Sequence, residues 1–296
     1  MVPEQGNGGP RDARAAASAA PPAKSTLYQP AIALQFFKAF GKAENIAKGQ
    51  AIFVENQKGA GVFSGDSKMY LLVEGDVTLS VGKKPIGLVN KGEIFGEMAP
   101  INHAPRTATA TAKSPCTVMA LDEKQFLAAI VKTPEFALML MSIIIGRLRE
   151  TVANLTLGGK LTDADRWNQA AVFDQKLLAE IAHQFEDKPA SLHQLNKVIL
   201  KEGDKGVFMY IVLDGVVAIS IADKVVEKIG PGGVFGEMAL VDQSARVATA
   251  VAETDCTALS INRNDFMSLV KTKPAFALSL LKALSERLRF MTAKYK

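Results

Sequence analysis

The chain has 296 residues, of which 48% are hydrophobic and 22% are charged, so it has length for about two domains with real cores. A formal net charge of +5 at pH 7 is too weak to indicate nucleic-acid binding by itself. Two cysteines and three histidines exclude a disulfide scaffold and argue against a metal site. Neither an apolar run of membrane-spanning length nor a signal peptide is found, so we expect a cytoplasmic protein without a membrane span.

The first half of the chain begins with a tail at residues 1–24, which is rich in Gly, Pro, Ala and Ser and is predicted to be disordered. A helical pattern follows at residues 32–40. Short apolar segments bounded by turn residues then predict strands at residues 52–54, 69–73, 77–81 and 86–89.

Two more strands are predicted after Arg106, in the alternating stretch TATATA and at residues 116–121. The period then changes to that of a helix around Phe126, and a second helix follows. Thr133 is suited to cap this helix and Pro134 to occupy its first position. Its apolar stretch, residues 138–145, is interpreted as a core face, with a dimer seam as the alternative.

The same order recurs in the second half, with a helical segment at residues 174–185. Strands are predicted there at residues 198–200, 209–213, 216–221 and 225–229. Cys116 and Cys256 fall at equivalent points of the two halves and are interpreted as buried small hydrophobic residues.

An internal repeat explains this recurrence. KGEIFGEMAPINHAPRTATATA begins at Lys91, and PGGVFGEMALVDQSARVATAVA begins at Pro231. The offset of 140 residues holds without a gap from residues 69–150 onto 209–290, with far more identities than chance allows. Upstream, the first copy carries seven extra residues in a Gly-rich stretch at residues 56–68, which we interpret as a loop. The chain therefore carries one fold twice.

The predicted fold is mainly β with helices. It consists of two tandem small antiparallel β-barrels, jelly-roll-like, each flanked by N- and C-terminal helices. Domain 1, called repeat 1 below, spans residues 25–155. A linker follows at residues 156–172, and domain 2, called repeat 2, spans residues 173–296.

The motif Phe-Gly-Glu-Met-Ala occurs in both repeats, and an arginine, Arg106 or Arg246, follows nine residues after its glutamate. A glycine lets the backbone approach a ligand closely, and the free N–H groups of a helical turn bind anions. A carboxylate accepts sugar hydroxyl groups, and a guanidinium fits two oxygens of a phosphate. This set suits a ribose phosphate. It supplies no nucleophile, general base or metal ligands, so we expect no enzyme and no catalytic residues.

Both repeats resemble the cyclic nucleotide-binding domain family, which includes bacterial catabolite activators, kinase regulatory subunits and nucleotide-gated channels. The resemblance rests on the two cassettes, on the strands beside them and on closing helices that end in Arg-Leu-Arg. It implies that Glu97 and Glu237 bind the ribose 2′-hydroxyl, that Arg106 and Arg246 bind the cyclic phosphate, and that the last helix of each repeat closes over the base. The implied ligand-binding residues are Gly96, Glu97, Met98, Ala99, Arg106, Thr107, Ala108, Gly236, Glu237, Met238, Ala239, Arg246, Val247 and Ala248.

The cassettes depart from the family pattern in three places. Pro100 replaces a usual Leu, Ala245 replaces a usual Pro, and Val247 lies where a small or hydroxyl residue is common. Thr107 carries a hydroxyl that could meet the amino group of guanine, whereas Val247 cannot. We therefore expect the two sites to differ in affinity or base preference. Thr151 lies where activator-type relatives place a base-contacting hydroxyl.

These features predict a signalling protein that binds cyclic AMP, with cyclic GMP as the alternative ligand and no other cofactor. It would change conformation and act through an unidentified protein partner, and a homo-oligomer is compatible with the sequence. One alternative is a scaffold with vestigial cassettes, in which the glutamate and arginine of each cassette simply pair with each other. Another is a transcription regulator without its own helix-turn-helix. Direct DNA binding is not expected, because the sequence ends at Lys296 directly after the last closing helix.

Overall fold

A computed structural model describes residues 28–57, 67–162, 166–188 and 190–294. The predicted tail at residues 1–24 and most of the predicted Gly-rich loop lie outside these ranges. The elements of repeat 1 are α1 (Pro30–Phe40), β1 (Lys42–Ile46), β2 (Ala51–Phe53), β3 (Lys68–Glu74), β4 (Val77–Val81), β5 (Lys84–Val89), β6 (Ile94–Phe95), α2 (Met98–Asn102), β7 (Thr109–Ala112), β8 (Cys116–Asp122), α3 (Glu123–Lys132) and α4 (Glu135–Leu157).

Repeat 2 has the same order of elements, preceded by one additional strand. Its elements are β9 (Trp167–Gln169), α5 (Gln175–Gln184), β10 (Ser191–His193), β11 (Val198–Leu200), β12 (Phe208–Asp214), β13 (Val217–Ile221), β14 (Lys224–Ile229), β15 (Val234–Phe235), α6 (Glu237–Asp242), β16 (Thr249–Ala252), β17 (Cys256–Asn262), α7 (Arg263–Thr272) and α8 (Pro274–Ala293). The predicted helices and strands are thus confirmed to within a few residues.

Each repeat contains two sheets with jelly-roll connectivity, as predicted. The strand orders are β1-β8-β3-β6 and β2-β7-β4-β5 in repeat 1, and β10-β17-β12-β15 and β11-β16-β13-β14-β9 in repeat 2. Alternation explains the packing: in β7, Ala110 and Ala112 are buried and the threonines beside them are half-buried. The sheets face each other as a sandwich and do not close into a barrel, because no strand of the described residues pairs across from one sheet to the other.

Part of the segment that the sequence predicted as a linker pairs with the second sandwich. Strand β9 pairs parallel with β14, and the ring of Trp167 stacks on Phe290 of α8 with centroids 6.0 Å apart. The first residues of the predicted linker continue α4. The connection between the repeats is therefore bound to repeat 2 along part of its length.

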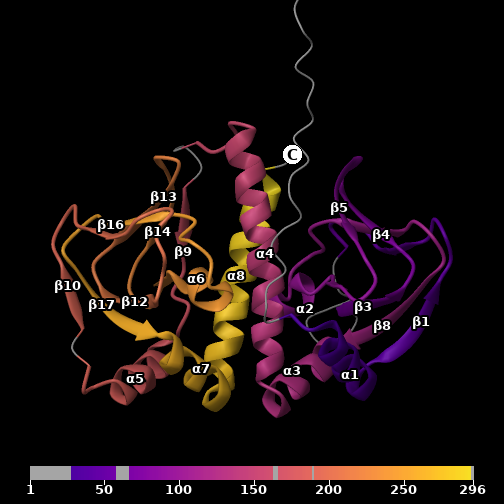
Figure 1. Cartoon of the computed structure of the whole chain (residues 1–296), viewed down its shortest axis with the longest axis horizontal. Coiled ribbons are helices and arrows are strands. Elements are labelled where there is room, and N and C mark those ends of the chain that lie inside the picture. Colours follow the sequence, from indigo (N-terminus) through magenta and orange to yellow (C-terminus); the bar gives the residue numbers. More distant parts are fainter. Residues whose placement is uncertain (1–27, 58–66, 163–165, 189, 295–296) are drawn as a thin grey trace, which may run out of the picture.

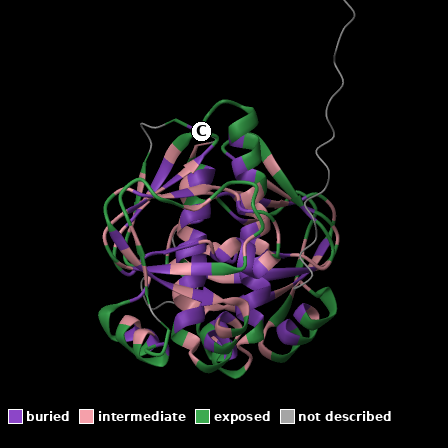
Figure 2. Cartoon of the chain, turned by 60° about the vertical axis from the view of Figure 1, so that its left-hand side comes forward, coloured by how far each residue is buried: buried purple, intermediate pink, exposed green. Residues whose placement is uncertain are grey.

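The long helices α4 and α8 lie side by side between the two sandwiches and begin at the same end of the molecule (Figure 1). Residues 138–145 of α4 are buried apart from Ile143, which is half-buried. One hydrophobic core runs through both repeats along these helices, and Figure 2 shows the buried residues concentrated there. The apolar stretch therefore forms a seam, but between two parts of the same chain.

Helix α4 begins at a sharp bend, 119° from the direction of α3. Thr133 was predicted to cap α4, but it ends α3 instead, and Pro134 occupies the position before α4 without a side-chain cap. Pro134 already has helical angles, which moves the boundary one residue along the chain. Among the described residues, no single helix has the length and apolar character of a membrane span, although α3 and α4 together pass that test despite their bend.

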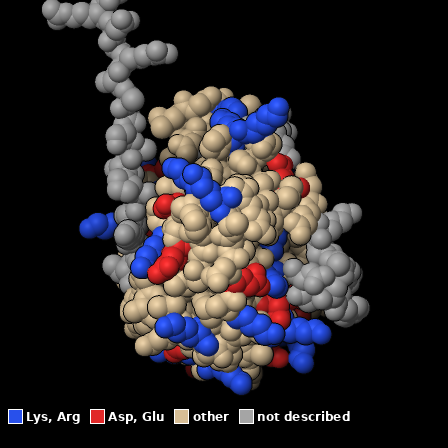
Figure 3. Space-filling view, turned by 90° about the vertical axis from the view of Figure 1, so that its right-hand side faces the viewer, with Lys and Arg blue, Asp and Glu red and all other residues tan. Residues whose placement is uncertain are grey.

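Both cysteines are free and buried, as the sequence predicted. On the outward face of repeat 1, the described Lys and Arg side chains are interspersed with Asp and Glu and form no continuous basic stripe (Figure 3). This mixed distribution differs from the clustered positive charge that is typical of nucleic-acid-binding surfaces.

Candidate functional site

A glycine with positive φ begins each cassette turn. Gly96 has φ +71° and Gly236 has φ +82°, a region that other residues rarely adopt. A Cβ atom on Gly96 would lie 2.8 Å from a ring carbon of Phe53, and one on Gly236 would lie 2.8 Å from Nη1 of Arg246. Glycine is therefore required at both positions by conformation and by space.

The cassette arginines are buried and hold the turn in shape. Arg106 donates from Nη1 to the carbonyl of Gly96 (2.7 Å) and from Nη2 to the carbonyl of Lys68 (2.8 Å). Its guanidinium also lies 4.2 Å from the ring centroid of Phe53. Arg246 repeats this pattern with the carbonyls of Gly236 and Phe208, at 2.6 Å each.

Burial lowers the pKa of both cassette arginines, because it removes water from the charged guanidinium. Tyr70 and Glu97 oppose this shift at Arg106. The two bonds to carbonyls account for two of the five N–H groups of each guanidinium. Each site thus contains a desolvated positive charge with further donors.

The cassette glutamates pair with the long helices and not with the cassette arginines. Glu97 accepts a bond from Nη1 of Arg147 on α4 at 2.6 Å. Its second oxygen, Oε2, is buried and has no partner among the described residues. In the alternative of a vestigial cassette, Glu97 would pair with Arg106. The pairing of Glu97 with Arg147 differs from that expectation.

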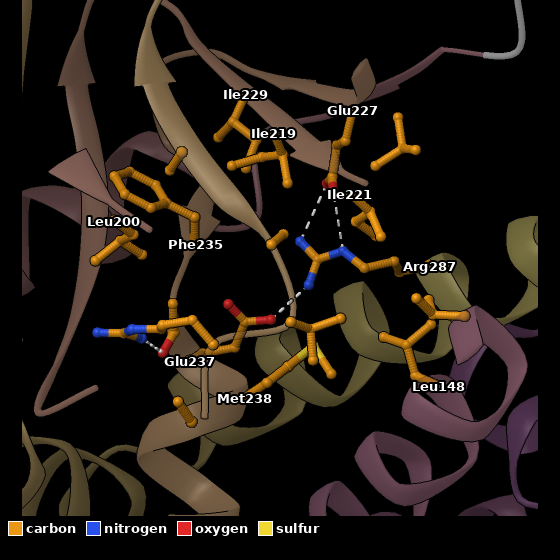
Figure 4. Close-up of a pocket in the computed structure, with 18 of the residues that line it drawn as sticks. Leu148, Leu200, Ile219, Ile221, Glu227, Ile229, Phe235, Glu237, Met238 and Arg287 are labelled. Carbon is orange, nitrogen blue, oxygen red and sulfur yellow. Dashed lines mark hydrogen bonds and ion pairs between the residues drawn. The ribbon is translucent and has the colours of Figure 1, made fainter. Parts of the chain in front are cut away.

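In repeat 2 the equivalent arginine, Arg287 on α8, lies between two buried carboxylates. It donates to Glu237 at 2.5 Å and makes two bonds of 3.0 Å to Glu227 on β14 (Figure 4). Burial alone lowers the pKa of Arg287, but the two carboxylates outweigh it and hold this pKa above its usual value. Burial raises the pKa of Glu227; Arg287 opposes the shift and Glu237 adds to it.

A cavity of about 80 Å³ opens beside this triad. Its walls are aliphatic side chains of β13 and β14 together with the cassette, and the carboxylate of Glu237 points into it (Figure 4). Leu148 and Val152 of α4 also line it, so repeat 1 contributes to the wall of the cavity in repeat 2. An apolar cavity with a few converging charged groups is the usual form of a small-molecule site.

All seven residues predicted for repeat 2 line this one cavity: Gly236, Glu237, Met238, Ala239, Arg246, Val247 and Ala248. In repeat 1, Gly96, Glu97 and Arg106 come together as described above. Thr107 lies beside Met98, with its hydroxyl 3.7 Å from the sulfur, and Ala99 and Ala108 are buried.

The departures from the family pattern have small local effects. Pro100 lies in the first turn of α2, where a missing N–H breaks no helical bond, and α2 is one residue shorter than α6. Thr151 is buried on α4, but the α4 residues that line the repeat 2 cavity are Leu148 and Val152.

No role was predicted from the sequence for Arg147, Arg287 or Glu227. The two arginines align at the 140-residue offset, which was a usable signal. Glu227 aligns with Gly87, so the signal for Glu227 was that the two repeats carry different residues at this position. Within the described residues, no group of three or more His, Cys, Asp or Glu side chains could hold a metal ion.

The sequence model of the cyclic nucleotide-binding domain matches residues 43–133 and 193–273, together more than half of the chain. The chain therefore belongs to the cyclic nucleotide-binding domain family and carries two such domains in tandem. This domain type is a ligand-binding domain and not a catalytic one.

Three curated relatives illustrate the range of the family. The cyclic AMP receptor protein of Thermus thermophilus is 35% identical over 103 residues, covering 33% of this chain and 48% of the relative. The cGMP-dependent protein kinase of Toxoplasma gondii is 27% identical over 233 residues, covering 79% of this chain and 20% of the kinase. The cAMP-dependent protein kinase regulatory subunit of Colletotrichum orbiculare is 29% identical over 196 residues, covering 64% of this chain and 44% of the subunit. The matches thus span less than half of the length of each relative.

Proposed function

We propose that the protein is a cyclic nucleotide sensor that binds cyclic AMP at both cassettes and regulates a protein partner. The observation that carries this proposal is the buried Oε2 of Glu97, which has no partner within the described part of the chain and lies beside the desolvated Arg106. A buried acceptor without a donor is costly, so it favours a ligand that brings a hydroxyl group.

The ligand would satisfy each group in turn. Its cyclic phosphate supplies a negative counter-charge for the buried guanidinium groups of Arg106 and Arg246. Its ribose hydroxyl donates to Glu97 or Glu237, and the aliphatic cavity of repeat 2 suits a purine base.

Binding would produce a signal because the helix arginines already occupy the cassette glutamates. A ribose hydroxyl that donates to the carboxylate of Glu97 or Glu237 weakens the ion pair that the same carboxylate forms with Arg147 on α4 or Arg287 on α8. The ligand can shift the helices only as far as its affinity differs between the two arrangements. We propose no catalytic step, and the output is the altered surface that a partner reads.

The choice between cyclic AMP and cyclic GMP rests on the residue after each cassette arginine. The names of the relatives contain both nucleotides. Thr107 offers a hydroxyl that suits a guanine amino group, and Val247 does not. We therefore propose cyclic AMP as the ligand of repeat 2, and repeat 1 as the site that tolerates cyclic GMP better.

A second candidate is a scaffold whose cassettes no longer bind. The position of Arg287 favours this function at repeat 2, because Arg287 pairs with Glu237 and also makes two hydrogen bonds to Glu227. It would leave the buried oxygen of Glu97 unexplained.

Calorimetric titration of the full chain with cyclic AMP, and separately with cyclic GMP, separates the two functions. A sensor binds with micromolar or tighter affinity, and the Arg106→Ala/Arg246→Ala double variant abolishes the heat. The absence of heat and of thermal stabilisation with both nucleotides would support the scaffold and refute the sensor.

A further inference from the structure

One arginine of repeat 1 binds the cassette loop of repeat 2. Arg149 lies on α4, two residues after Arg147. Its Nε and Nη2 bind the two carboxylate oxygens of Asp242 at 2.5 and 3.1 Å, and its Nη1 binds the carbonyl of Ala245 at 2.9 Å. Asp242 is the last residue of α6, and Ala245 directly precedes Arg246. The guanidinium therefore binds both ends of the loop that precedes Arg246. We call these bonds of Arg149 to Asp242 and Ala245 the clamp.

The loop itself depends on the same carboxylate. Oδ1 of Asp242 also accepts the backbone N–H of Ser244 at 3.0 Å, and Gln243 between them has a left-handed φ of +58°. The Arg149 side chain is 23% exposed and that of Asp242 is 9% exposed. A two-pronged pair with this little exposure is held more firmly than a surface ion pair.

Repeat 1 stabilises its loop by other means. Pro105 takes the place of Ala245, and its ring fixes φ directly before Arg106. Asn102 takes the place of Asp242 and donates to the hydroxyl of Ser285 on α8 at 3.0 Å. Arg289, the counterpart of Arg149, is exposed, and no described residue forms an ion pair with it. Repeat 2 thus has a clamp from its neighbour at the position where repeat 1 has a proline.

We propose that Arg149 is a positioning residue for the phosphate-binding loop of repeat 2, so that ligand affinity in repeat 2 depends on the long helix of repeat 1. This inference rests on the proposed function and names a regulation of its second site. Because Arg147 on the same helix binds Glu97, a ligand that takes Glu97 acts two residues from the clamp. Occupancy of the first site then changes the affinity of the second, and the coupling is reciprocal.

The test uses the full chain and two readouts. Amide hydrogen exchange of residues 236–246 without nucleotide reports the order of the loop. Calorimetry with cyclic AMP in an Arg106→Ala background reports the affinity of repeat 2 alone. Arg149→Ala is compared with Arg289→Ala, which is the matched control on α8, and circular dichroism checks that each variant is folded.

We expect Arg149→Ala to speed exchange in residues 236–246 but not in residues 96–106, and to weaken cyclic AMP binding at repeat 2 about tenfold, in keeping with the loss of charge-assisted hydrogen bonds. Binding at repeat 1, measured in an Arg246→Ala background, stays unchanged. Arg149→Lys retains part of the affinity. Adding Ala245→Pro to Arg149→Ala restores affinity, because the ring replaces the clamp.

Unchanged exchange, or unchanged affinity at repeat 2 in a variant with faster exchange, would overturn the proposal. Equal weakening at both repeats would overturn it as well, because the effect would then be a general loss of stability. If the wild-type protein binds no cyclic nucleotide, the sensor function fails. The positioning of the loop is then decided by the exchange data alone.

Discussion

Glu227 of repeat 2 occupies the same strand position as Gly87 of repeat 1. Each is paired with the equivalent residue of the neighbouring strand, Ile219 on β13 or Leu79 on β4. Only repeat 2 therefore has a buried carboxylate at this point. Arg287 is shared between two acids, whereas Arg147 has Glu97 and the carbonyl of Ile94 as its partners. The two sites have different electrostatics although their cassettes are alike.

The first prediction concerns pH. Burial raises the pKa of Glu227 above its ordinary value, which means that the folded protein holds the proton more tightly than the unfolded chain. The stabilising contribution of this group is then complete below the unfolded pKa and is lost as pH rises through the folded pKa. We expect the free energy of unfolding of the wild type, relative to Glu227→Gln, to fall as pH rises above the ordinary glutamate pKa of about 4.3.

Urea denaturation at a series of pH values measures this difference. Glu74→Gln, at an exposed position, is the control and should show a flat difference. A relative stability that rises with pH would mean that Arg287 outweighs burial and lowers the pKa of Glu227.

The second prediction concerns the cassette arginines. Arg106→Ala and Arg246→Ala should each weaken nucleotide binding at their own site by about 2–5 kcal/mol, because each leaves a buried phosphate without its counter-charge. Calorimetry resolves the two sites by stoichiometry, and Arg289→Ala is the exposed control. If both variants bound like the wild type, the assignment of the cassettes would be wrong.

The third prediction concerns the cassette glycine of repeat 1. Gly96→Ala places a Cβ atom 2.8 Å from a Phe53 ring carbon and forces a left-handed conformation on alanine. We expect a loss of about 1–2 kcal/mol of stability from the backbone conformation, together with weaker binding at repeat 1. Gly87→Ala is the control, because a Cβ there meets no atom within 4 Å. Thermal denaturation measures the stability of both variants, and titration measures their nucleotide affinity. Equal stability and equal affinity of Gly96→Ala and Gly87→Ala would contradict the described turn.

The fourth prediction concerns base preference. Thr107→Val should reduce the affinity of repeat 1 for cyclic GMP relative to cyclic AMP by about three- to tenfold, the range expected for one hydrogen bond. Val247→Thr should shift the preference of repeat 2 toward cyclic GMP. Titrations of both nucleotides in single-site backgrounds measure the ratios. Ratios that do not move in either repeat would exclude these residues as base contacts.

The sequence predicted most strands, because their apolar segments are bounded by turn residues. It missed β1 and its counterpart β10. The residues KAENI of β1 are mostly exposed and show little apolar alternation, and both strands lie at the edge of a sheet. It also missed β6 and β15, which have two residues each. Strand β9 was assigned to a linker, because its pairing with β14 is a long-range contact that no local pattern encodes.

The cassette itself could be predicted, because its residues lie within a short stretch and occur twice. The partners of Glu97 and Glu237 could not, since Arg147 and Arg287 lie 50 residues further along the chain. The apolar stripe of α4 predicted a packed face, but an apolar stripe carries no information about whether its partner is a second copy or another part of the same chain.

The seam between α4 and α8 has a consequence for how the two sites can diverge. Contacts across it are reciprocal, because α8 contacts α2 and α4 contacts α6, as equivalent elements do in a symmetric dimer. In a true homodimer every substitution appears on both sides of the seam. Here the two halves are encoded separately, so a substitution can alter one side only. Glu227 has a glycine, Gly87, as its counterpart in repeat 1, and Arg149 makes an ion pair that its counterpart Arg289 does not make with any described residue. A symmetric dimer could not contain such differences between its halves.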